Sequence, residues 1–277
     1  MKGYQKRIYR AFLYVLIATI VFMVSFPLLA MFLGSVKPDG EIITATPAFF
    51  PHQLTLDHYT FAFRSMPLDS FFRNSIIVAT LVMAFSLAVS AYAAYILTRF
   101  AARGIGFITK VLVLFYMVPD IALVIGFYLV LDRIGLLNSY AGLVLGQSAI
   151  SVPFCVWLLW GYFKGIPIDL DEAAMVDGAS RIQTLARIIL PIAIPALFST
   201  GVFSFVLSWN EYTLASTLMI AEDLKTLPVG IALLTREGAY WGEIIAISSV
   251  ATIPAFIVIA FAMRYLVEGL SAGAVKG

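Results

Sequence analysis

Six long apolar segments decide what this chain can fold into, and they lie at residues 11–34, 71–97, 106–131, 139–163, 197–220 and 242–267. Each is long enough to cross a bilayer as a helix of about 20 residues. The whole chain is 61% hydrophobic and 12% charged, whereas a soluble domain carries roughly twice that charged share. The sequence therefore predicts an all-α integral membrane protein, with six transmembrane helices in a single domain over residues 1–277. The first segment is expected to be an uncleaved span, since no small-residue cleavage site follows it.

Lys and Arg residues give the expected orientation. With the N-terminus inside, twelve of the 18 basic residues fall on the inner side and six on the outer side. The positive-inside rule then places both termini in the cytoplasm, together with the loop at 164–196.

That loop contains the densest group of charges among the apolar segments. Asp169 is expected to cap a first short helix, with Asp171 and Glu172 in its first turn, where backbone N–H groups favour negative charge. Gly178 follows where a helix end needs positive φ. A second helix is expected from an apolar stripe that ends at two prolines (Ile182, Leu185, Ala186, Ile189, Pro191, Pro195). The pattern predicts a helical hairpin that docks on a partner.

Motifs for chemistry within this chain are missing from the sequence. There is no G-x-x-x-x-G-K-[ST] phosphate loop, nucleophile elbow or H-E-x-x-H motif. The single Cys155 cannot form an internal disulfide, and His52 and His58 alone do not predict a metal site. A net charge of +2 does not favour a nucleic-acid partner. We expect no enzyme activity and no metal or cofactor bound by this chain.

Polar residues within the apolar segments are the candidates for a translocation path, because charge in hydrocarbon is costly and usually faces a cavity or a partner. Asn210, Glu211 and Tyr212 lie in the fifth segment and Asp120 in the third, while Gln147, Ser148 and Ser151 mark the fourth. These groups suit a hydroxyl-rich solute. The alternative is that they form hydrogen bonds between helices or lie at segment ends.

At the hairpin the sequence resembles a known signature. Glu172-Ala173-Ala174, Gly178, Ile188 and Leu190-Pro191 match the E-A-A-x3-G-x9-I-x-L-P loop of ABC importer permeases, and Asp177 fits its common D-G-A form. Other matches are Asn74-Ser75, Trp209-Asn210-Glu211, Leu227-Pro228-Val229-Gly230 and the ending at 269–277. The whole is similar to the maltose-type (MalG-like) carbohydrate permeases.

The resemblance implies a type I ABC importer transmembrane domain in a bacterial or archaeal cytoplasmic membrane. It implies as partners a second, different permease chain, two ATPase subunits that carry ATP and Mg, an extracytoplasmic solute-binding protein and membrane lipid. Glu172 through Ala174 would form the face that docks on an ATPase subunit, Gly178 the bend, and Leu190-Pro191 the exit. Gly273, Lys276 and Gly277 would form a tail at the ATPase interface.

Two other functions are open from the residues alone. An ion-coupled secondary transporter would use Asp120 and Glu211 as proton or sodium sites. A membrane scaffold would use the hairpin without moving a solute. The resemblance favours a permease that moves a sugar, oligosaccharide or polyol by alternating access.

Overall fold

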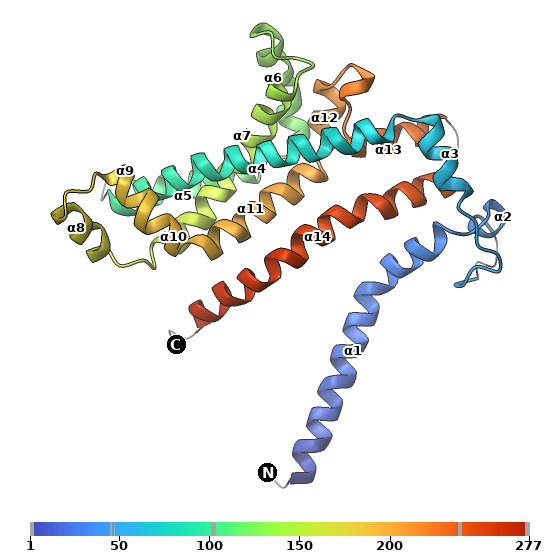
Figure 1. Cartoon of the computed structure of the whole chain (residues 1–277), viewed down its shortest axis with the longest axis horizontal. Helices are drawn as coiled ribbons and strands as arrows, with labels where there is room; N and C mark the ends of the chain where they lie inside the picture. The colour runs from blue at the N-terminus through green and yellow to red at the C-terminus, as the bar shows by residue number, and fades with distance from the viewer. Residues whose placement is uncertain (1–2, 45, 47, 101–103, 238–239, 275–277) are drawn as a thin grey trace. The chain divides into compact units, whose positions relative to one another are not determined.

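The computed structural model describes residues 3–44, 46, 48–100, 104–237 and 240–274, and the regular secondary structure of these residues is entirely helical. The all-α prediction is thus confirmed. Figure 1 labels the helices, which in chain order are α1 (Gly3–Gly34), α2 (Asp39–Ile42), α3 (Asp57–Ser65), α4 (Leu68–Arg99), α5 (Ile105–Tyr116), α6 (Asp120–Arg133), α7 (Tyr140–Phe163), α8 (Asp169–Val176), α9 (Arg181–Thr184), the π-turn η1 (Leu185–Ile189), α10 (Leu190–Ile192), α11 (Ile194–Trp209), α12 (Thr213–Leu218), the 3₁₀ turn η2 (Glu222–Leu224), α13 (Leu227–Glu237) and α14 (Trp241–Ala274).

Among the described residues, four stretches are long and apolar enough to cross a membrane as single helices: Lys6–Gly34, Leu68–Arg99, Tyr140–Phe163 and Trp241–Met263. Two bent pairs raise the number to six if each pair is one span. They are Gly106–Tyr116 with Asp120–Arg133, bent by 94°, and Arg181–Ile192 with Ile194–Trp209, bent by 84°.

The expected continuous helix over 197–220 is wrong. α11 ends at Trp209, and the separate helix α12 begins at Thr213, so Asn210 to Tyr212 form a break rather than the middle of a span. The break forms because the Glu211 carboxylate accepts hydrogen bonds from the backbone N–H groups of Leu214 and Ala215, which starts a new helix. The third segment contains a sharp bend before Asp120, because Pro119 has no N–H and precedes the first residue of α6.

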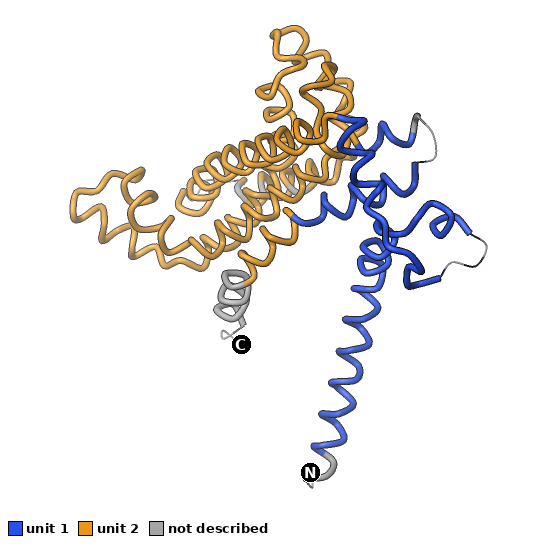
Figure 2. Tube along the Cα trace, turned by 45° about the vertical axis from the view of Figure 1, so that its right-hand side comes forward, with its two compact units in different colours: residues 1–66, 231–253 blue, residues 67–230, 254–277 orange. Residues whose placement is uncertain are grey.

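The chain divides into two compact units, coloured separately in Figure 2. Unit 2 comprises Pro67–Gly230 and Pro254–Gly277. Within it α4 packs along α7 and α11 (Figure 1). One buried cluster joins α4 to α6, α7 and α12 (Val78, Val82, Val124, Leu131, Leu143, Leu214, Ala215, Leu218, Met219, Val229). A second joins the end of α4 to α7, η1 and the start of α11 (Ala91, Ala94, Tyr95, Leu159, Phe163, Ile166, Leu185, Ile189, Ala193).

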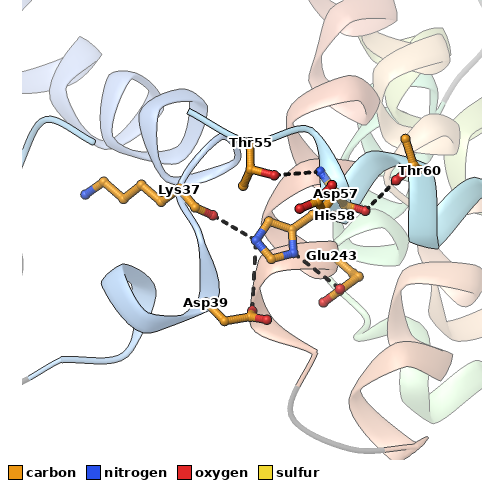
Figure 3. Close-up of polar contacts among 7 residues, drawn as sticks. All are labelled: Lys37, Asp39, Thr55, Asp57, His58, Thr60 and Glu243. Carbon is orange, nitrogen blue, oxygen red and sulfur yellow. Dashed lines mark hydrogen bonds and ion pairs between the residues drawn. The ribbon is translucent and has the colours of Figure 1, made fainter. Parts of the chain in front are cut away.

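Unit 1 comprises Met1–Met66 and Ile231–Ile253, and a buried histidine joins its segments. His58 of α3 is 3% exposed, and its Nε2 donates to the Lys37 carbonyl at 2.8 Å while Nδ1 lies 3.3 Å from Glu243 Oε1 (Figure 3). His52, by contrast, is exposed; its backbone N–H donates to Glu41 at 3.0 Å and lowers the pKa of that carboxyl. The two histidines therefore have separate partners.

Gly242 is required where α14 passes His58. A Cβ at this position would lie 2.1–2.5 Å from three atoms of the His58 ring, closer than any real contact. We expect Gly242→Ala to destabilise the protein by about 1–3 kcal/mol, measured as a lower melting temperature in detergent. Gly40→Ala is the matched control, because its added Cβ would meet nothing within 4 Å. An equal loss for Gly242→Ala in a His58→Ala background would show that the ring is not the cause.

Candidate functional site

The hairpin predicted from the sequence consists of α8, a turn at Gly178 and α9. Gly178 has φ +84°, a conformation that favours glycine. α8 begins at Asp169, and Ile168 precedes it without a side-chain cap. The prediction that Asp169 caps the helix is therefore wrong by one position. Asp169, Asp171 and Glu172 all lie in the first turn, where the free backbone N–H groups of the helix N-terminus stabilise negative charge.

The second arm begins with a capping box that the sequence reading did not identify. The Ser180 side chain accepts from the Gln183 N–H at 3.4 Å, and the Gln183 amide oxygen accepts from the Ser180 N–H at 2.8 Å. The signal is present as S-x-x-Q directly after the glycine turn. This cap starts α9, which continues into η1.

The two faces of α8 have different surroundings. Asp171 is 1% exposed and Ala174 5% exposed, and these two residues face into unit 2. Glu172, Ala173 and Asp177 are exposed, and Val176 is 87% exposed. Ala174 therefore does not share the exposed face with Glu172 and Ala173, as the expected docking face required, because it lies one helical turn from Asp171.

The exit arm packs on the core of unit 2. Leu185 and Ile189 are buried, whereas Ile182 and Ala186 are exposed, so only half of the predicted stripe faces inward. The inward side also includes Thr184, which is buried, and the partly buried Ile188. The signature residues Ile188 and Leu190 are partly buried against the second cluster, and Pro191 is exposed.

The expected tail is described only in part. Gly273 lies in the last turn of α14, while Lys276 and Gly277 lie outside the described residues.

A cavity of about 330 Å³ lies in unit 2 and brings together residues of five helices (α4, α5, α6, α7 and α11) and two helix breaks. Asp120 and Glu211 both line it, as the path prediction supposed. The remaining lining residues are Val82, Tyr116, Met117, Val118, Pro119, Gln147, Ile150, Ser151, Leu207 and Ser208. Carboxylate, amide, hydroxyl and aromatic groups thus meet in one space.

A chain of hydrogen bonds fixes Glu211 in this wall. Gln147 Nε2 donates to Glu211 Oε2 at 2.9 Å, and Ser208 Oγ donates to the Gln147 carbonyl. The Glu211 carboxylate also accepts from the N–H groups of Leu214 at 2.6 Å and Ala215 at 3.0 Å. Its two oxygens therefore accept three hydrogen bonds.

The other two predicted path residues do not line the cavity. The Asn210 side-chain amide donates to the Val206 carbonyl at 2.8 Å, within its own helix. Tyr212 is 40% exposed and is not among the residues that line the cavity. Tyr116 and Ser208 were missed, because aromatic and hydroxyl residues in an apolar segment carry no signal of which side faces a cavity.

Comparison with known proteins assigns the family. Residues 86–272 match the family described as binding-protein-dependent transport system inner membrane component. The chain belongs to this family. It is 35% identical to the sulfoquinovosyl glycerol transport system permease protein SmoH of Agrobacterium fabrum, over 91% of this chain and 89% of that protein. It is 36% identical to the trehalose/maltose transport system permease protein MalG of Thermococcus litoralis, over 91% of each chain.

The fold agrees with the family. A subunit of a bacterial ABC transporter involved in the import of the acidic polysaccharide alginate superposes with a TM-score of 0.78 at 23% identity, over 96% of this chain and 99% of that one. The matched range 86–272 contains both the hairpin and most of the cavity wall.

Two shorter matches noted in the sequence contact each other. Ser75 Oγ accepts from the Leu227 N–H at 2.8 Å, and Asn74 donates to the carbonyls of Asp223 at 2.8 Å and Lys225 at 2.9 Å. Gly230 leaves room for the Phe71 ring, since a Cβ there would lie 2.3 Å from it. These motifs attach the loop after α12 to the start of α4.

Gly178→Ala tests the turn of the hairpin. An alanine at φ +84° costs about 1–2 kcal/mol, so we expect amide hydrogen exchange across 169–189 to rise roughly 5–30-fold. Gly161→Ala is the control, because that glycine is helical and its Cβ would meet nothing within 4 Å. Unchanged exchange in Gly178→Ala would contradict a turn that depends on glycine.

Glu211→Ala tests the break before α12. It leaves the N–H groups of Leu214 and Ala215 without their acceptor, at about 1–3 kcal/mol for each buried donor. We expect a clear loss of thermal stability in detergent, with Glu211→Gln intermediate because its amide oxygen can still accept. The exposed Glu222→Ala should change little. A stable Glu211→Ala variant would show that this carboxylate does not hold the break.

Proposed function

We propose that this chain is the membrane-spanning permease subunit of an ATP-driven importer that moves a sugar, oligosaccharide or polyol by alternating access. ATP and Mg would be bound and hydrolysed on two separate ATPase subunits, and this chain would bind no cofactor itself. Its partners would be a second permease chain, an extracytoplasmic solute-binding protein and lipid. Both termini would lie in the cytoplasm.

The two-faced hairpin is the observation that carries this proposal. One edge of α8 is buried in unit 2, while Glu172, Ala173 and Asp177 remain exposed beside the apolar side chains of Val176 and Ile182. A short helix with an acidic and apolar outer face fits a cleft on another protein, with basic groups opposite its carboxylates. Closure of the ATPase pair around ATP would press on this face and shift the permease toward its outward-open state.

A carbohydrate solute is supported by the relatives and by the cavity. Among the relatives, SmoH is named for sulfoquinovosyl glycerol, MalG for trehalose and maltose, and DasC of Streptomyces coelicolor, 35% identical over 91% of this chain, for diacetylchitobiose. All of these solutes carry many hydroxyl groups. The cavity offers Asp120, Glu211 and Gln147 to hydrogen-bond hydroxyls and Tyr116 as an aromatic wall.

One further candidate function is an ion-coupled transporter, which the presence of Asp120 and Glu211 in one cavity favours. The exposed acidic and apolar face of α8 weighs against it, because an ion-coupled transporter needs no docking face for a partner.

Copurification and Glu172→Ala test the proposal together. Tagged protein should bring down an ATPase subunit and a second permease. In proteoliposomes of that complex with its binding protein, uptake from a panel of trehalose, maltose and diacetylchitobiose should require ATP. Glu172→Ala should reduce it by roughly 5–150-fold.

Glu222→Ala, an exposed acid outside the hairpin, should leave uptake unchanged. Uptake that persists without ATP, but stops when ionophores collapse the proton and sodium gradients, would favour the ion-coupled alternative. Absence of an ATPase subunit from the purified complex would overturn the importer.

A further inference from the structure

The end of α4 contains a buried ionic contact with the hairpin. Arg99 Nε lies 2.8 Å from Asp171 Oδ2, and the two side chains are 4% and 2% exposed. Tyr95 Oη, one turn earlier, donates to the other Asp171 oxygen at 2.6 Å. Arg99 Nη2 also donates to the Ile166 carbonyl at 3.3 Å, which attaches the loop before α8 to α4. Asp171 is therefore bound to α4 through both carboxylate oxygens.

The contact between Arg99 and Asp171 is an ion pair rather than a directed hydrogen bond. Neither Arg99 Nε nor Asp171 Oδ2 has a hydrogen bond of good geometry, although their separation is 2.8 Å. A charge–charge attraction depends weakly on angle, whereas a hydrogen bond weakens steeply as it bends. The pair can thus stay in contact while α8 rotates by a small amount.

The other arm of the hairpin also contacts this end of α4. The Arg181 guanidinium, at the start of α9, lies over the Phe100 ring at 4.8 Å from its centroid. A small cavity of about 180 Å³ lies between these elements. Both arms are therefore attached to the same helical turn.

α4 continues from this attachment to the polar cavity. Its 32 residues contain neither proline nor glycine, so no kink interrupts it. Val82, on the same helix, lines the cavity that holds Asp120 and Glu211. Tyr95 follows Val82 by 13 residues, which corresponds to roughly 20 Å along the helix at 1.5 Å per residue.

We propose that Asp171, Arg99 and Tyr95 are positioning residues that transmit movement of the coupling hairpin into α4 and so to the cavity wall. This rests on the proposed function, in which an ATPase subunit presses on the exposed face of α8. A buried ion pair couples two elements tightly, because separating them leaves each charge without a partner in a low-dielectric site.

The test uses the assembled transporter and a reporter cysteine. Leu207, which lines the cavity, is changed to Cys in a Cys155→Ala background, and its maleimide labelling rate is compared without nucleotide and after trapping with ATP and vanadate. In this parent we expect at least a fivefold difference. The double variant Arg99→Gln/Asp171→Asn leaves no unpaired charge, and we expect it to hydrolyse ATP while the labelling difference falls below twofold.

Tyr95→Phe retains both charges and removes one hydrogen bond, so its labelling difference should fall between these values. Asp132→Asn, an exposed acid on α6, is the control and should match the parent. A double variant that keeps the full labelling difference overturns the proposal. If the double variant does not assemble, a Tyr95→Phe variant with the same labelling difference as the parent overturns it instead. A parent whose labelling does not respond to ATP overturns the proposed function, and this inference with it.

Discussion

Every break in a membrane-spanning helix exposes backbone groups that water cannot reach, and side chains must satisfy them. In unit 2 the Glu211 carboxylate accepts from the N–H groups of Leu214 and Ala215 at the break before α12. After α12, the Asn138 amide oxygen accepts from the N–H groups of Ile220 and Ala221, each at 2.9 Å. The broken helices around the cavity depend on these polar residues, so their first role is to make the break possible.

A polar residue in an apolar segment can satisfy a helix break, line a cavity, or do both, and the sequence alone does not tell these roles apart. The sequence identified Glu211 and Asp120 as unusual, and both line the cavity. It could not separate them from Asn210, which bonds back to its own helix. The difference arises from helix rotation and from the end of α11 at Trp209, which is stabilised by contacts with residues more than 60 positions away, such as Gln147. Local patterns contain no information on those partners.

The hairpin was more predictable, because its signals are local. Gly178 with positive φ, the acids of the first turn and the prolines beyond Leu190 were all read from neighbouring residues. The sequence did not predict which side of α8 faces inward. Asp171 and Glu172 are adjacent acids of similar chemistry, yet one is 1% exposed and the other lies on the surface. The positions of Arg99 and Tyr95 on α4, 72 and 76 residues earlier, distinguish them.

The pairing of Asp171 also determines the outer face of the hairpin. Consecutive residues on an α-helix point about 100° apart, so fixing Asp171 against Arg99 directs Ala174 inward one turn later and turns Glu172, Ala173 and Val176 outward. The buried pair and the exposed signature are therefore two consequences of one constraint. A partner that pushes on the outer face therefore acts on a helix whose inner face is bound by charge to α4.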